Sequence, residues 1–398
     1  MSSQTKTTKA TPSLRFREFS ERWQEMKVGE FCTCFSGGTP SSGRRDYYGG
    51  EIPFIRSAEI RSPRTALFLT EKGFRSSAAK LVIAGDLLVA LYGANSGEVG
   101  ISRIDGAINQ AILCIRTEQS VDFLCFFLEH SKDRIVATYL QGGQGNLSGQ
   151  IVQAIGVPIP TLPEQRKIAD FLTAVDGRIG QLSQKKALLQ DYKKGVMQQL
   201  FTQALRFKDD HGNDFPEWEE KTLGEIGKIT TGKTPSTSDD AAWIGDTMFV
   251  TPTDIGEDTK FQRSTKRHVN GEKLLLIPKH SLMFTCIASV GKMSIATEPC
   301  ITNQQINSVS VGPGSFFEFV YYALRYLTPQ IKATQANTTL PIINKTEFSK
   351  FVLPVPSIPE QTKIANFLTA LDRKIESVSQ QITHTQTFKK GLLQQMFV

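Results

Sequence analysis

The stretch that decides the fold runs from Pro163 to Phe201, PEQRKIADFLTAVDGRIGQLSQKKALLQDYKKGVMQQLF, and recurs from Pro359 to Phe397 as PEQTKIANFLTALDRKIESVSQQITHTQTFKKGLLQQMF. The two copies align without a gap at an offset of 196 residues, with 21 of 39 positions identical. The segments that precede each copy agree only in scattered positions. This tandem duplication, with constant arms and divergent intervening segments, predicts two equivalent tasks directed at two different targets.

Both copies carry the pattern of a long helix that packs against a partner helix. From Ile168 and from Ile364, alternating steps of four and three residues meet apolar side chains at eight positions out of ten, which is typical of a coiled-coil seam. Proline at the start of each copy suits the first helical turn, and the glutamate after it is favourable at the positive end of the helix dipole. The predicted seam comprises Ile168, Leu172, Val175, Ile179, Leu182 and Leu189 in the first arm and Ile364, Leu368, Leu371, Ile375, Val378 and Ile382 in the second.

The predicted arms are longer than a compact domain needs for its own core. At 1.5 Å per residue each arm spans about 55–60 Å, so we expect the arms to act as spacers. If the halves are related by a pseudo-two-fold axis, the arms pack as an antiparallel coiled coil with one globular domain at each end. The alternative, an ordinary long helix pair inside one larger domain, leaves the full-length duplication unexplained.

The segments between the arms are predicted to be two diverged copies of one mixed α/β (α+β) domain. Apolar runs such as 87–92 and 281–287 indicate strands, and 123–139 and 316–327 indicate helices. Matching positions are Arg15-Phe16-Arg17 and Arg206-Phe207-Lys208, Trp23 and Trp218, Thr39-Pro40-Ser41 and Thr234-Pro235-Ser236, and Asn109-Gln110 and Asn303-Gln304. The predicted domains are residues 1–160 and 206–356, followed by the repeated helices at 161–205 and 357–398.

Composition limits the class of protein without identifying it. The 398 residues are 39% hydrophobic and 21% charged, which is ordinary for globular proteins, and the net charge of +7 permits a polyanionic partner. The six cysteines are scattered, so buried free thiols are expected rather than a zinc site. Residues 1–12 form a polar tail that is neither a secretory signal nor a membrane span. We therefore expect a cytoplasmic protein.

The order of these motifs resembles a known family. A domain, then Pro-x-Pro, then Pro-Glu-Gln-x-Lys-Ile-Ala-x-Phe-Leu at the start of a long helix, all of it repeated, is similar to the specificity subunit of a type I restriction-modification enzyme. The likeness extends from the Gly-Gly-Thr-Pro loop at 37–40 through the second arm. It implies two target recognition domains, each reading one half of a split, asymmetric DNA sequence, with the gap set by the helices.

The resemblance also implies partners and cofactors. The partners would be double-stranded DNA, two modification (methyltransferase) subunits and two restriction (translocase and nuclease) subunits. Those subunits would carry S-adenosylmethionine, ATP and Mg, so no catalytic residue, cofactor or metal is expected in this chain. The expected location is the cytoplasm of a bacterium or archaeon, with no membrane partner. Lys193, Lys194, Lys389 and Lys390, near the arm ends, are candidates for partner docking.

Basic stretches at 44–75 and 260–279 are predicted to meet DNA. Phosphate contacts supply position and salt-dependent affinity, whereas Arg to guanine and Asn or Gln to adenine supply base choice. A solvated basic face is the alternative for any one of these residues, and Asn109-Gln110 and Asn303-Gln304 are expected to make a shared structural hydrogen bond instead. The candidates are Arg44, Arg45, Arg56, Arg61, Arg64, Gln144, Asn146, Lys233, Thr234, Lys260, Arg263, Lys266 and Arg267.

A nucleotide-binding protein, a self-contained DNA-modifying enzyme and a coiled-coil scaffold that does not bind DNA are the alternative functions. Gly227 to Thr234 matches the phosphate-binding pattern Gly-x-x-x-x-Gly-Lys-Thr, but Pro235 and a polar run follow where that loop requires a helix. The chain has no Pro-Pro dipeptide for the Asn/Asp-Pro-Pro-aromatic motif of amino-methyltransferases. A scaffold would explain the arms but not the basic, divergent domains.

Overall fold

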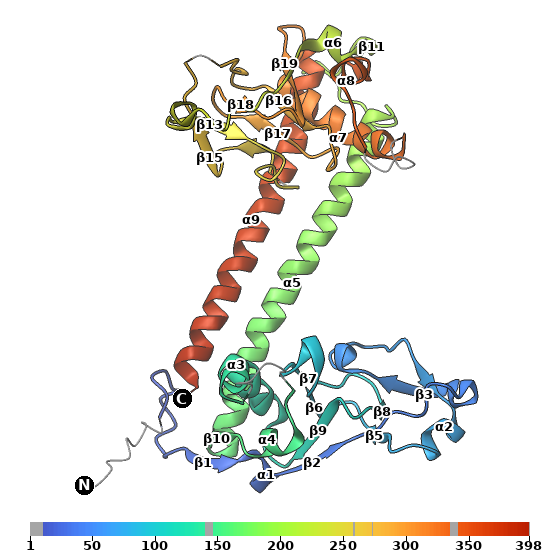
Figure 1. Cartoon of the computed structure of the whole chain (residues 1–398), viewed down its shortest axis with the longest axis vertical. Helices are drawn as coiled ribbons and strands as arrows, with labels where there is room; N and C mark the ends of the chain where they lie inside the picture. Colours follow the sequence, from blue (N-terminus) through green and yellow to red (C-terminus); the bar gives the residue numbers. More distant parts are fainter. Residues whose placement is uncertain (1–10, 140–145, 258, 273, 335–340, 398) are drawn as a thin grey trace. The chain divides into compact units, whose positions relative to one another are not determined.

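The computed structural model describes residues 11–139, 146–257, 259–272, 274–334 and 341–397. The chain folds into two compact units: unit 1 comprises Met1–Ser183 and Gln380–Val398, and unit 2 comprises Gln184–Ser379. Helix α5 (Leu162–Phe201) begins in unit 1 and ends in unit 2, whereas α9 (Ile358–Met396) begins in unit 2 and ends in unit 1 (Figure 1). Each unit therefore combines the start of one long helix with the end of the other.

Unit 1 is built on an antiparallel sheet with the order β2-β9-β6-β7 and a second sheet with the order β4-β3-β8-β5, in which β3 and β8 are parallel. Its strands are β1 (Gln24–Lys27), β2 (Cys32–Ser36), β3 (Tyr48–Ile55), β4 (Phe68–Leu69), β5 (Lys80–Val82), β6 (Leu87–Ala90), β7 (Val99–Ile101), β8 (Gly106–Ile108), β9 (Ile112–Thr117) and β10 (Gly156–Ile159). Its shorter helices are α1 (Val28–Phe31), α2 (Glu71–Arg75), α3 (Val121–Tyr139) and α4 (Gly149–Gln153), with 3₁₀ turns η1 (Arg45–Tyr47), η2 (Ser57–Glu59) and η3 (Gly93–Asn95). Strand β1 pairs with β10 just before α5 begins.

Unit 2 repeats this plan with a sheet of order β12-β19-β16-β17-β14 and a second sheet of order β15-β13-β18. Its strands are β11 (Glu219–Thr222), β12 (Gly227–Thr231), β13 (Thr247–Val250), β14 (Phe261–Gln262), β15 (Arg267–Val269), β16 (Leu282–Thr285), β17 (Met293–Ala296), β18 (Ile301–Thr302), β19 (Ile306–Val311) and β20 (Val352–Val355). Its shorter helices are α6 (Leu223–Ile226), α7 (Phe317–Thr334) and α8 (Lys345–Ser349), with the 3₁₀ turn η4 (Asp240–Trp243). Strand β11 pairs with β20 just before α9 begins.

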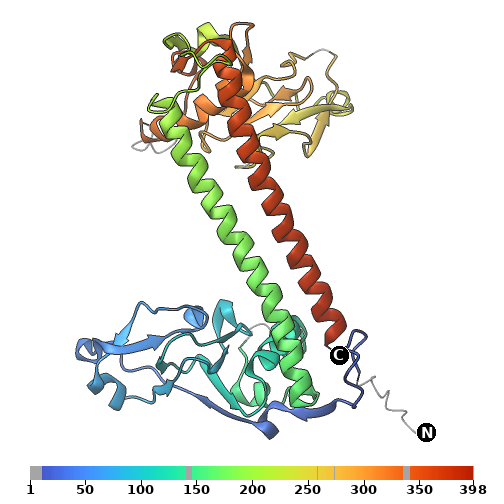
Figure 2. The same ribbon diagram turned by 180° about the vertical axis from the view of Figure 1, so that it is seen from behind.

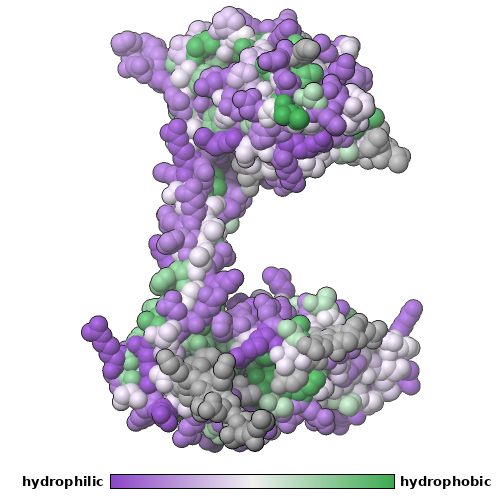
Figure 3. Space-filling view, turned by 60° about the vertical axis from the view of Figure 1, so that its left-hand side comes forward, coloured by the Kyte–Doolittle hydropathy of each residue, from purple (hydrophilic) through white to green (hydrophobic). Residues whose placement is uncertain are grey.

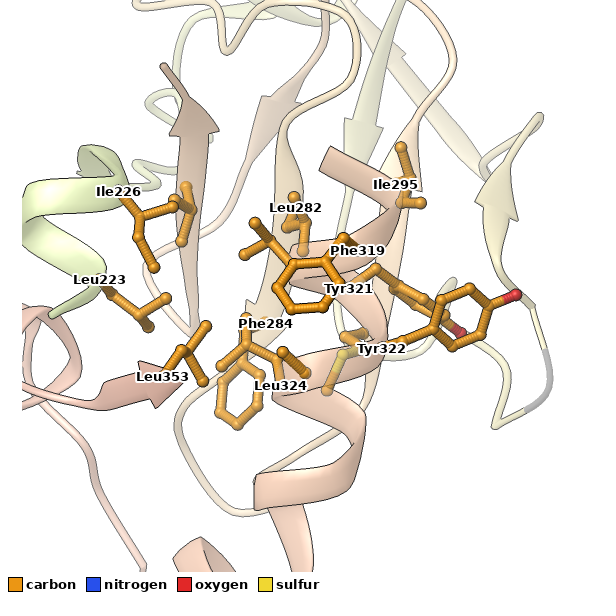
Figure 4. Close-up of a cluster of buried hydrophobic side chains, with 14 of the residues drawn as sticks. Leu223, Ile226, Leu282, Phe284, Ile295, Phe319, Tyr321, Tyr322, Leu324 and Leu353 are labelled. Carbon is orange, nitrogen blue, oxygen red and sulfur yellow. The ribbon is translucent and has the colours of Figure 1, made fainter. Parts of the chain in front are cut away.

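The core of unit 2 forms where α7 covers the larger sheet. Phe319, Tyr322 and Leu324 of α7 gather beside Leu282 and Phe284 of β16 (Figure 4), and all five are essentially inaccessible to solvent. Burial of each such side chain contributes about 1.5–3 kcal/mol. In unit 1, α3 supplies the equivalent residues against β6 and β9.

The ends of the long helices complete the core of the unit in which they finish. In unit 1, Phe397 packs against Phe123 and Phe127 of α3, with ring centroids 5.3 and 5.9 Å apart. In unit 2, Phe201 stacks on Tyr326 of α7 at 5.1 Å. The red end of α9 and the green start of α5 are both found in the unit that carries the C-terminal label (Figure 2).

One ion pair joins the two helix segments in each unit. In unit 1, Lys389 Nζ lies 2.8 Å from Asp176 Oδ2, and in unit 2, Lys193 pairs with Asp372. Each residue of one pair lies 196 positions from its counterpart in the other pair, so the duplication preserved the contact. Because each pair joins the first half of one helix to the second half of the other, the segments run antiparallel within each unit.

The helix boundaries lie close to those predicted, since α5 and α9 each begin one residue before the predicted proline. All of the predicted seam residues are buried or partly buried. The predicted helices at 123–139 and 316–327 appear as α3 and α7. The sequence did not reveal β14, a strand of unit 2 that pairs in parallel with β17 and has no counterpart in the β2-β9-β6-β7 sheet.

Candidate nucleic-acid interface

The repeated Pro-Glu-Gln motif fixes each domain to its long helix. In unit 1 the Glu164 carboxylate, with a side chain only 1% exposed, accepts hydrogen bonds from Arg15 Nε and Nη2, both at 2.7 Å. The indole nitrogen of Trp23 donates to the same carboxylate at 3.3 Å. Both long helices have a glutamate at their start. The hydrogen bonds explain this residue better than the helix dipole alone does, because a buried carboxylate requires a partner.

The same junction recurs in unit 2. Arg206 Nε and Nη2 donate to Glu360 at 3.2 and 3.0 Å, and Trp218 Nε1 donates at 3.1 Å. In both copies the hydrogen bond to the glutamate is the largest cause that raises the arginine pKa above its ordinary value. The parallel recurrence of Arg, Trp and Glu in the sequence was the signal that could have identified this junction.

The glutamine of the motif closes the connection before the helix. Gln165 Nε2 donates to the carbonyl of Pro160 at 2.9 Å, and its Oε1 accepts from the Ser120 amide at 3.0 Å. In unit 2, Gln361 makes the equivalent bonds to Pro356 and Phe316 at 2.8 and 2.7 Å. The Pro-Glu-Gln motif therefore has the same structural role in both units. Residues that distinguish one unit from the other must lie outside this motif.

A second repeated feature is the turn that follows β2 in unit 1 and β12 in unit 2. A Cβ added at Gly37 would lie 1.8 Å from the Ile108 carbonyl oxygen, and one added at Gly232 would lie 2.2 Å from that of Asn303. Two residues after each glycine, a threonine donates to a glutamine, with Thr39 to Gln110 at 2.5 Å and Thr234 to Gln304 at 2.6 Å. The expected shared structural bond is present, and it occupies the Thr234 hydroxyl.

The segment that matches the phosphate-binding pattern in sequence, Gly227 to Thr234, does not have the structure that such a loop requires. Gly227 to Thr231 is strand β12, paired with β19, and the chain continues without a helix to the 3₁₀ turn η4. Gly232 is required by its close approach to backbone oxygens rather than by a bound phosphate. Between the glycine and the threonine, unit 1 has Gly38 and unit 2 has the exposed Lys233.

The arginines of unit 1 that are predicted to contact DNA differ in whether a carboxylate of the chain already pairs with them. Arg44 pairs with Asp46 through Nε at 3.0 Å and Nη2 at 2.9 Å, and its hydrogen bond is the main cause that holds the Asp46 pKa well below its usual range. Arg56 pairs with Glu59 at 2.9 Å. Arg45 and Arg64 are exposed and form no ion pair within the described part of the chain.

Arg61 is held more firmly than its neighbours. Its Nε donates to the Val99 carbonyl at 2.7 Å, and its Nη2 lies 2.9 Å from Glu129 of α3. These contacts tie the segment after β3 to α3, which gives Arg61 a structural role whether or not it meets DNA. Asn146 is exposed, and Gln144 lies outside the described residues.

In unit 2 the exposed basic candidates are Lys233, Arg263, Lys266 and Arg267. The Arg267 guanidinium stacks on the Trp243 ring at 3.6 Å, so its orientation is fixed while its edge stays accessible. The other three form no ion pair in the ranges that the structure describes. These residues lie on or beside β14, β15 and the shared turn.

Lys260 is a correction to the sequence prediction. Its side chain is only 10% exposed, and its ammonium group lies 2.5 Å from Glu318, 2.6 Å from Thr369 and 3.0 Å from the Tyr322 hydroxyl. Burial lowers its pKa, and the neighbouring Glu318 opposes that shift. Lys260 is therefore an internal link between β14, α7 and α9 and does not present its charge to a phosphate.

The Lys260 network continues to the repeated ion pair of unit 2. The Tyr322 hydroxyl donates to Asp372 at 2.5 Å, and Asp372 also pairs with Lys193 of α5. Burial and the nearby carboxylate raise the pKa of Tyr322. At the equivalent position unit 1 has Phe126, and Lys389 lies 5.1 Å above its ring, so this polar network is a feature of unit 2 alone.

A groove of about 1260 Å³ lies beside this network within unit 2, between the segments of α5 and α9 and the region around β14. Its basic residues outnumber its acidic ones. The basic residues are Lys186, Lys193, Lys194, Lys260, Arg263, Arg325 and Arg373, and the acidic ones are Asp254, Asp372 and Glu376. Figure 3 shows a surface on which hydrophilic residues predominate and hydrophobic ones are scattered.

Within the described ranges, no group of three or more His, Cys, Asp or Glu side chains is arranged so that it could hold a metal ion. All six cysteines are free, and burial raises the pKa of Cys114, Cys125 and Cys300 to about 12. Among residues with described positions, no helix combines the length and apolar character that a membrane span requires.

Known protein families and sequences are similar to most of the chain. The model of the family described as "Type I restriction modification DNA specificity domain" matches residues 20–190 and 216–384. The MjaVIII specificity subunit of a type I restriction enzyme from Methanocaldococcus jannaschii is 22% identical over 404 residues, covering 94% of this chain and 91% of that protein. Several other specificity subunits of type I restriction enzymes are similar to the chain.

Two solved structures share the fold. The S subunit of a type I restriction-modification system from M. genitalium has a TM-score of 0.61 at 16% identity, covering 98% of this chain and 99% of that one. A chain from a type I system studied for complex assembly and conformational transition has a TM-score of 0.62 at 18% identity, covering 93% and 96%. The two-domain plan with repeated long helices is therefore a shared architecture.

Proposed function

Because the chain belongs to the family of type I restriction-modification DNA specificity proteins, we propose that it is the subunit that chooses the DNA sequence on which a type I restriction-modification complex acts. Each unit reads one half of a split target in double-stranded DNA. The two half-sites differ in sequence because the two recognition domains have diverged. The helices α5 and α9 set the gap between the half-sites.

The observation that carries this proposal is the contrast between constant junctions and divergent domains. The Arg-Trp-Glu junction has the same contacts in both units, with Glu164 in one and Glu360 in the other. The exposed basic candidates share no such correspondence, since unit 1 presents Arg45 and Arg64 and unit 2 presents Lys233 and Arg263. A protein that read one palindromic sequence twice would keep both sets alike.

Affinity and base choice come from different contacts in this proposal. The exposed lysines and arginines neutralise phosphates, so binding weakens as salt rises. Guanidinium groups with a fixed orientation, such as Arg267 on Trp243, are suited to bidentate contact with a guanine edge in the major groove. Arg44 reaches a base only by exchanging its contact with Asp46, because that carboxylate holds two of its nitrogens.

The catalytic chemistry belongs to partner subunits in this proposal. Two modification subunits bring S-adenosylmethionine and methylate adenine, and two restriction subunits bring ATP-dependent translocation and Mg-dependent cleavage. The chain contributes position and sequence choice. The equivalent ion pairs Lys389–Asp176 and Lys193–Asp372 show that the same helix contact recurs in each unit, which suits equal attachment of two identical partners.

A domain exchange tests the proposal most directly. Residues 206–356 are replaced with the matching segment of a related specificity subunit, and the methylated sites are read by methylome sequencing of cells that carry the chain and its modification subunit. One half-site changes while the other half-site and the gap stay the same. A change in both half-sites, or in neither, contradicts modular reading, and absence of DNA binding at low salt supports the scaffold alternative.

A further inference from the structure

Two chains of polar contacts begin at the repeated ion pairs of the long helices. Lys193 and Lys389, which the sequence offers as candidates for partner docking, have side chains only 17% exposed, and both ammonium groups are paired within the chain. From each pair, contacts continue through the helix that covers the core and end in the basic stretch of that unit, 44–75 or 260–279. We call each chain of contacts a tether. The unit 1 tether comprises Asp176, Lys389, Glu129 and Arg61, and the unit 2 tether comprises Asp372, Lys193, Tyr322 and Lys260.

The unit 1 tether runs from α9 through α3 to the segment that follows η2. Lys389 Nζ lies 3.8 Å from one carboxylate oxygen of Glu129, and Arg61 Nη2 donates to the other at 2.9 Å. Arg61 Nε also donates to the Val99 carbonyl of β7 at 2.7 Å. A Cβ added at Gly100 would lie 2.6 Å from Arg61 Cγ, so the arginine stem packs closely on β7. The guanidinium is therefore fixed on both α3 and β7.

The unit 2 tether reaches its basic stretch by different chemistry. Asp372, which pairs with Lys193, accepts a hydrogen bond of 2.5 Å from the Tyr322 hydroxyl. The Lys260 ammonium group donates to that same hydroxyl at 3.0 Å. The Lys260 carbonyl accepts from the Ile295 amide of β17 at 2.8 Å. The residue directly before β14 is therefore fixed on both α7 and β17.

Both tethers end three residues before an exposed arginine. Arg64 follows Arg61 in unit 1, and Arg263 follows Lys260 in unit 2, at the same spacing. Neither Arg64 nor Arg263 forms an ion pair in the part of the chain that the structure describes, so each presents its full charge to solvent. These two arginines are among the residues predicted to contact DNA.

Short hydrogen bonds hold the turn between each tether and its arginine. In unit 1 the Ser62 hydroxyl donates to the Arg64 carbonyl at 2.5 Å. In unit 2 the buried Gln262 amide donates to the Ser264 carbonyl at 2.6 Å and to the Asp254 carbonyl at 3.3 Å. The backbone that carries each exposed arginine is therefore fixed relative to the end of its tether.

The tethers belong to the divergent part of the molecule, unlike the Arg-Trp-Glu junctions. Phe126 occupies in unit 1 the position of Tyr322, and Arg325 occupies in unit 2 the position of Glu129, each pair 196 residues apart. Arg325 donates to the carbonyl of Glu257 at 2.9 Å, so this helix position also contacts the loop before the basic stretch. Each unit therefore attaches its own basic stretch to the repeated Lys–Asp pair in its own way.

Core stability alone does not account for these polar chains. A buried ion pair adds little net stability compared with well-packed apolar residues of similar volume, and the Phe126 ring shows that the fold accepts an apolar side chain at the position of Tyr322. A network of directional contacts does fix position, because hydrogen bonds weaken steeply as their geometry departs from the optimum. The same geometric sensitivity governs the contacts that distinguish one base from another.

We propose that Arg61 and Lys260 are positioning residues for base choice, each of which holds the basic stretch of its own unit at a fixed place on the long helices. They act through the backbone and touch neither base nor phosphate. Each tether therefore determines how strictly its own unit reads its half-site, and the two half-sites are controlled separately. This inference rests on the proposed function, which supplies the split DNA target.

The test uses the full chain in complex with its modification subunit, after methylome sequencing has given the target. Methylation rates are measured on duplexes that carry one substituted base pair in one half-site, or a gap changed by one base pair, and are compared with the matched duplex. Glu129→Ala leaves the Arg61 charge in place but removes its carboxylate partner. The rate on mismatched relative to matched duplexes rises by roughly tenfold or more in one half-site only. The other half-site and the gap stay as strict as before.

The matched control in unit 1 is Glu118→Ala. Glu118 is exposed and forms no ion pair in the described ranges, so its removal changes the net charge equally without loosening the tether. Methylation of every duplex by this variant equals that of the unmodified chain. If Arg61 instead contacted a phosphate directly, Arg61→Gln would lower the salt dependence of binding and Glu129→Ala would relax neither half-site, which would overturn the proposal.

The unit 2 variant is Lys260→Met combined with Glu318→Gln, because a buried carboxylate left without its partner would be strongly destabilising. This double variant relaxes the half-site that Glu129→Ala leaves strict. Tyr322→Phe is a milder variant that the fold accommodates, since unit 1 has phenylalanine at the equivalent position. It relaxes the same half-site as the double variant, to a smaller extent, and leaves the salt dependence of binding unchanged.

Three results would overturn the proposal while leaving the proposed function intact. One is an equal fall in rate on matched and mismatched duplexes, which indicates a purely structural role. Another is relaxation of both half-sites by a variant of one unit, and the third is a change in the gap with both half-sites still strict. An unmodified chain that directs methylation to no split target, or binds no DNA, would refute the proposed function instead.

Discussion

Arg15 and Glu164 form a two-point ion pair in which the carboxylate is almost completely buried, and the pair joins the start of the chain to the first turn of α5. The residues are 149 positions apart in sequence. The contact is therefore a tertiary clamp between domain and helix, and its duplicate at Arg206 and Glu360 makes the clamp a property of the repeat.

The first prediction concerns this clamp. Glu164→Gln leaves the Arg15 guanidinium without its charge partner and lowers the free energy of unfolding of unit 1 by about 3 kcal/mol or more, as expected when one member of a buried pair is removed. Urea unfolding followed by tryptophan fluorescence measures the change. Glu18→Gln is the control, because the Glu18 contact to Lys167 is exposed to solvent and an exposed ion pair adds little to stability. Equal effects of the two variants would contradict the clamp.

The second prediction separates two kinds of glycine in unit 1. Gly37→Ala places a Cβ against the Ile108 carbonyl and destabilises the unit by about 1–3 kcal/mol through forced backbone movement. Gly177→Ala, in α5, meets open space and stabilises the chain by about 0.5–1 kcal/mol. Thermal melting of both variants checks the opposite signs, and a shared sign would be inconsistent with the geometry of the turn.

The third prediction concerns salt dependence of DNA binding. Arg263→Gln and Lys266→Gln each lower the slope of log affinity against log salt by about 0.9 when the residue neutralises one phosphate. Lys260→Gln leaves that slope unchanged, because its ammonium group is held by Glu318, and reduces the stability of unit 2 instead. Fluorescence anisotropy over a salt series distinguishes them. An unchanged slope in both exposed-residue variants would remove Arg263 and Lys266 from the interface.

The fourth prediction concerns acid stability of unit 1. Burial opposes ionisation of Glu59, but hydrogen bonds from Arg56, Ala66 and Thr65 outweigh it and lower the pKa from 4.5 to about 2. A depressed folded-state pKa contributes stability that is fully present above pH 4.5 and is lost as the pH falls toward 2. Glu59→Gln removes this contribution, of order 1–3 kcal/mol. The melting temperature of the variant therefore falls less steeply than that of the unmodified chain as the pH is lowered. A profile that stays as steep as that of the unmodified chain would argue against the Glu59 contacts.

The sequence predicted the elements whose causes are local. The helix starts at Pro163 and Pro359 follow from residue preferences in the first helical turn, so the sequence located them to within one residue. The seam follows from heptad spacing, so the sequence identified which face of each helix is buried. The junction partner of Glu164 could not, because nothing local links positions 15 and 164. The duplication held that information, since Arg15 and Trp23 recur with Glu164 at the matching offset.

The sequence failed where side-chain direction decides the role. Lys260 belongs to a basic run, and linear charge density does not tell whether an ammonium group faces solvent or a glutamate in the core. Its direction depends on β14, a two-residue strand too short to give a periodic signal. Likewise, the sequence does not reveal that Lys193 and Lys389 pair with Asp372 and Asp176, because each aspartate lies on the other long helix.

The reciprocal exchange of helix ends between the units has a consequence for the order in which the polypeptide matures on the ribosome. Phe397 fills a space between Phe123 and Phe127, and Met396 and Leu392 belong to the same core. The N-terminal half can therefore emerge, form its sheets and still lack part of its interior until translation has passed residue 397. Until then, apolar surface on α3 is available to chaperones, and premature termination within the last turns of α9 would harm the half of the protein that was made first.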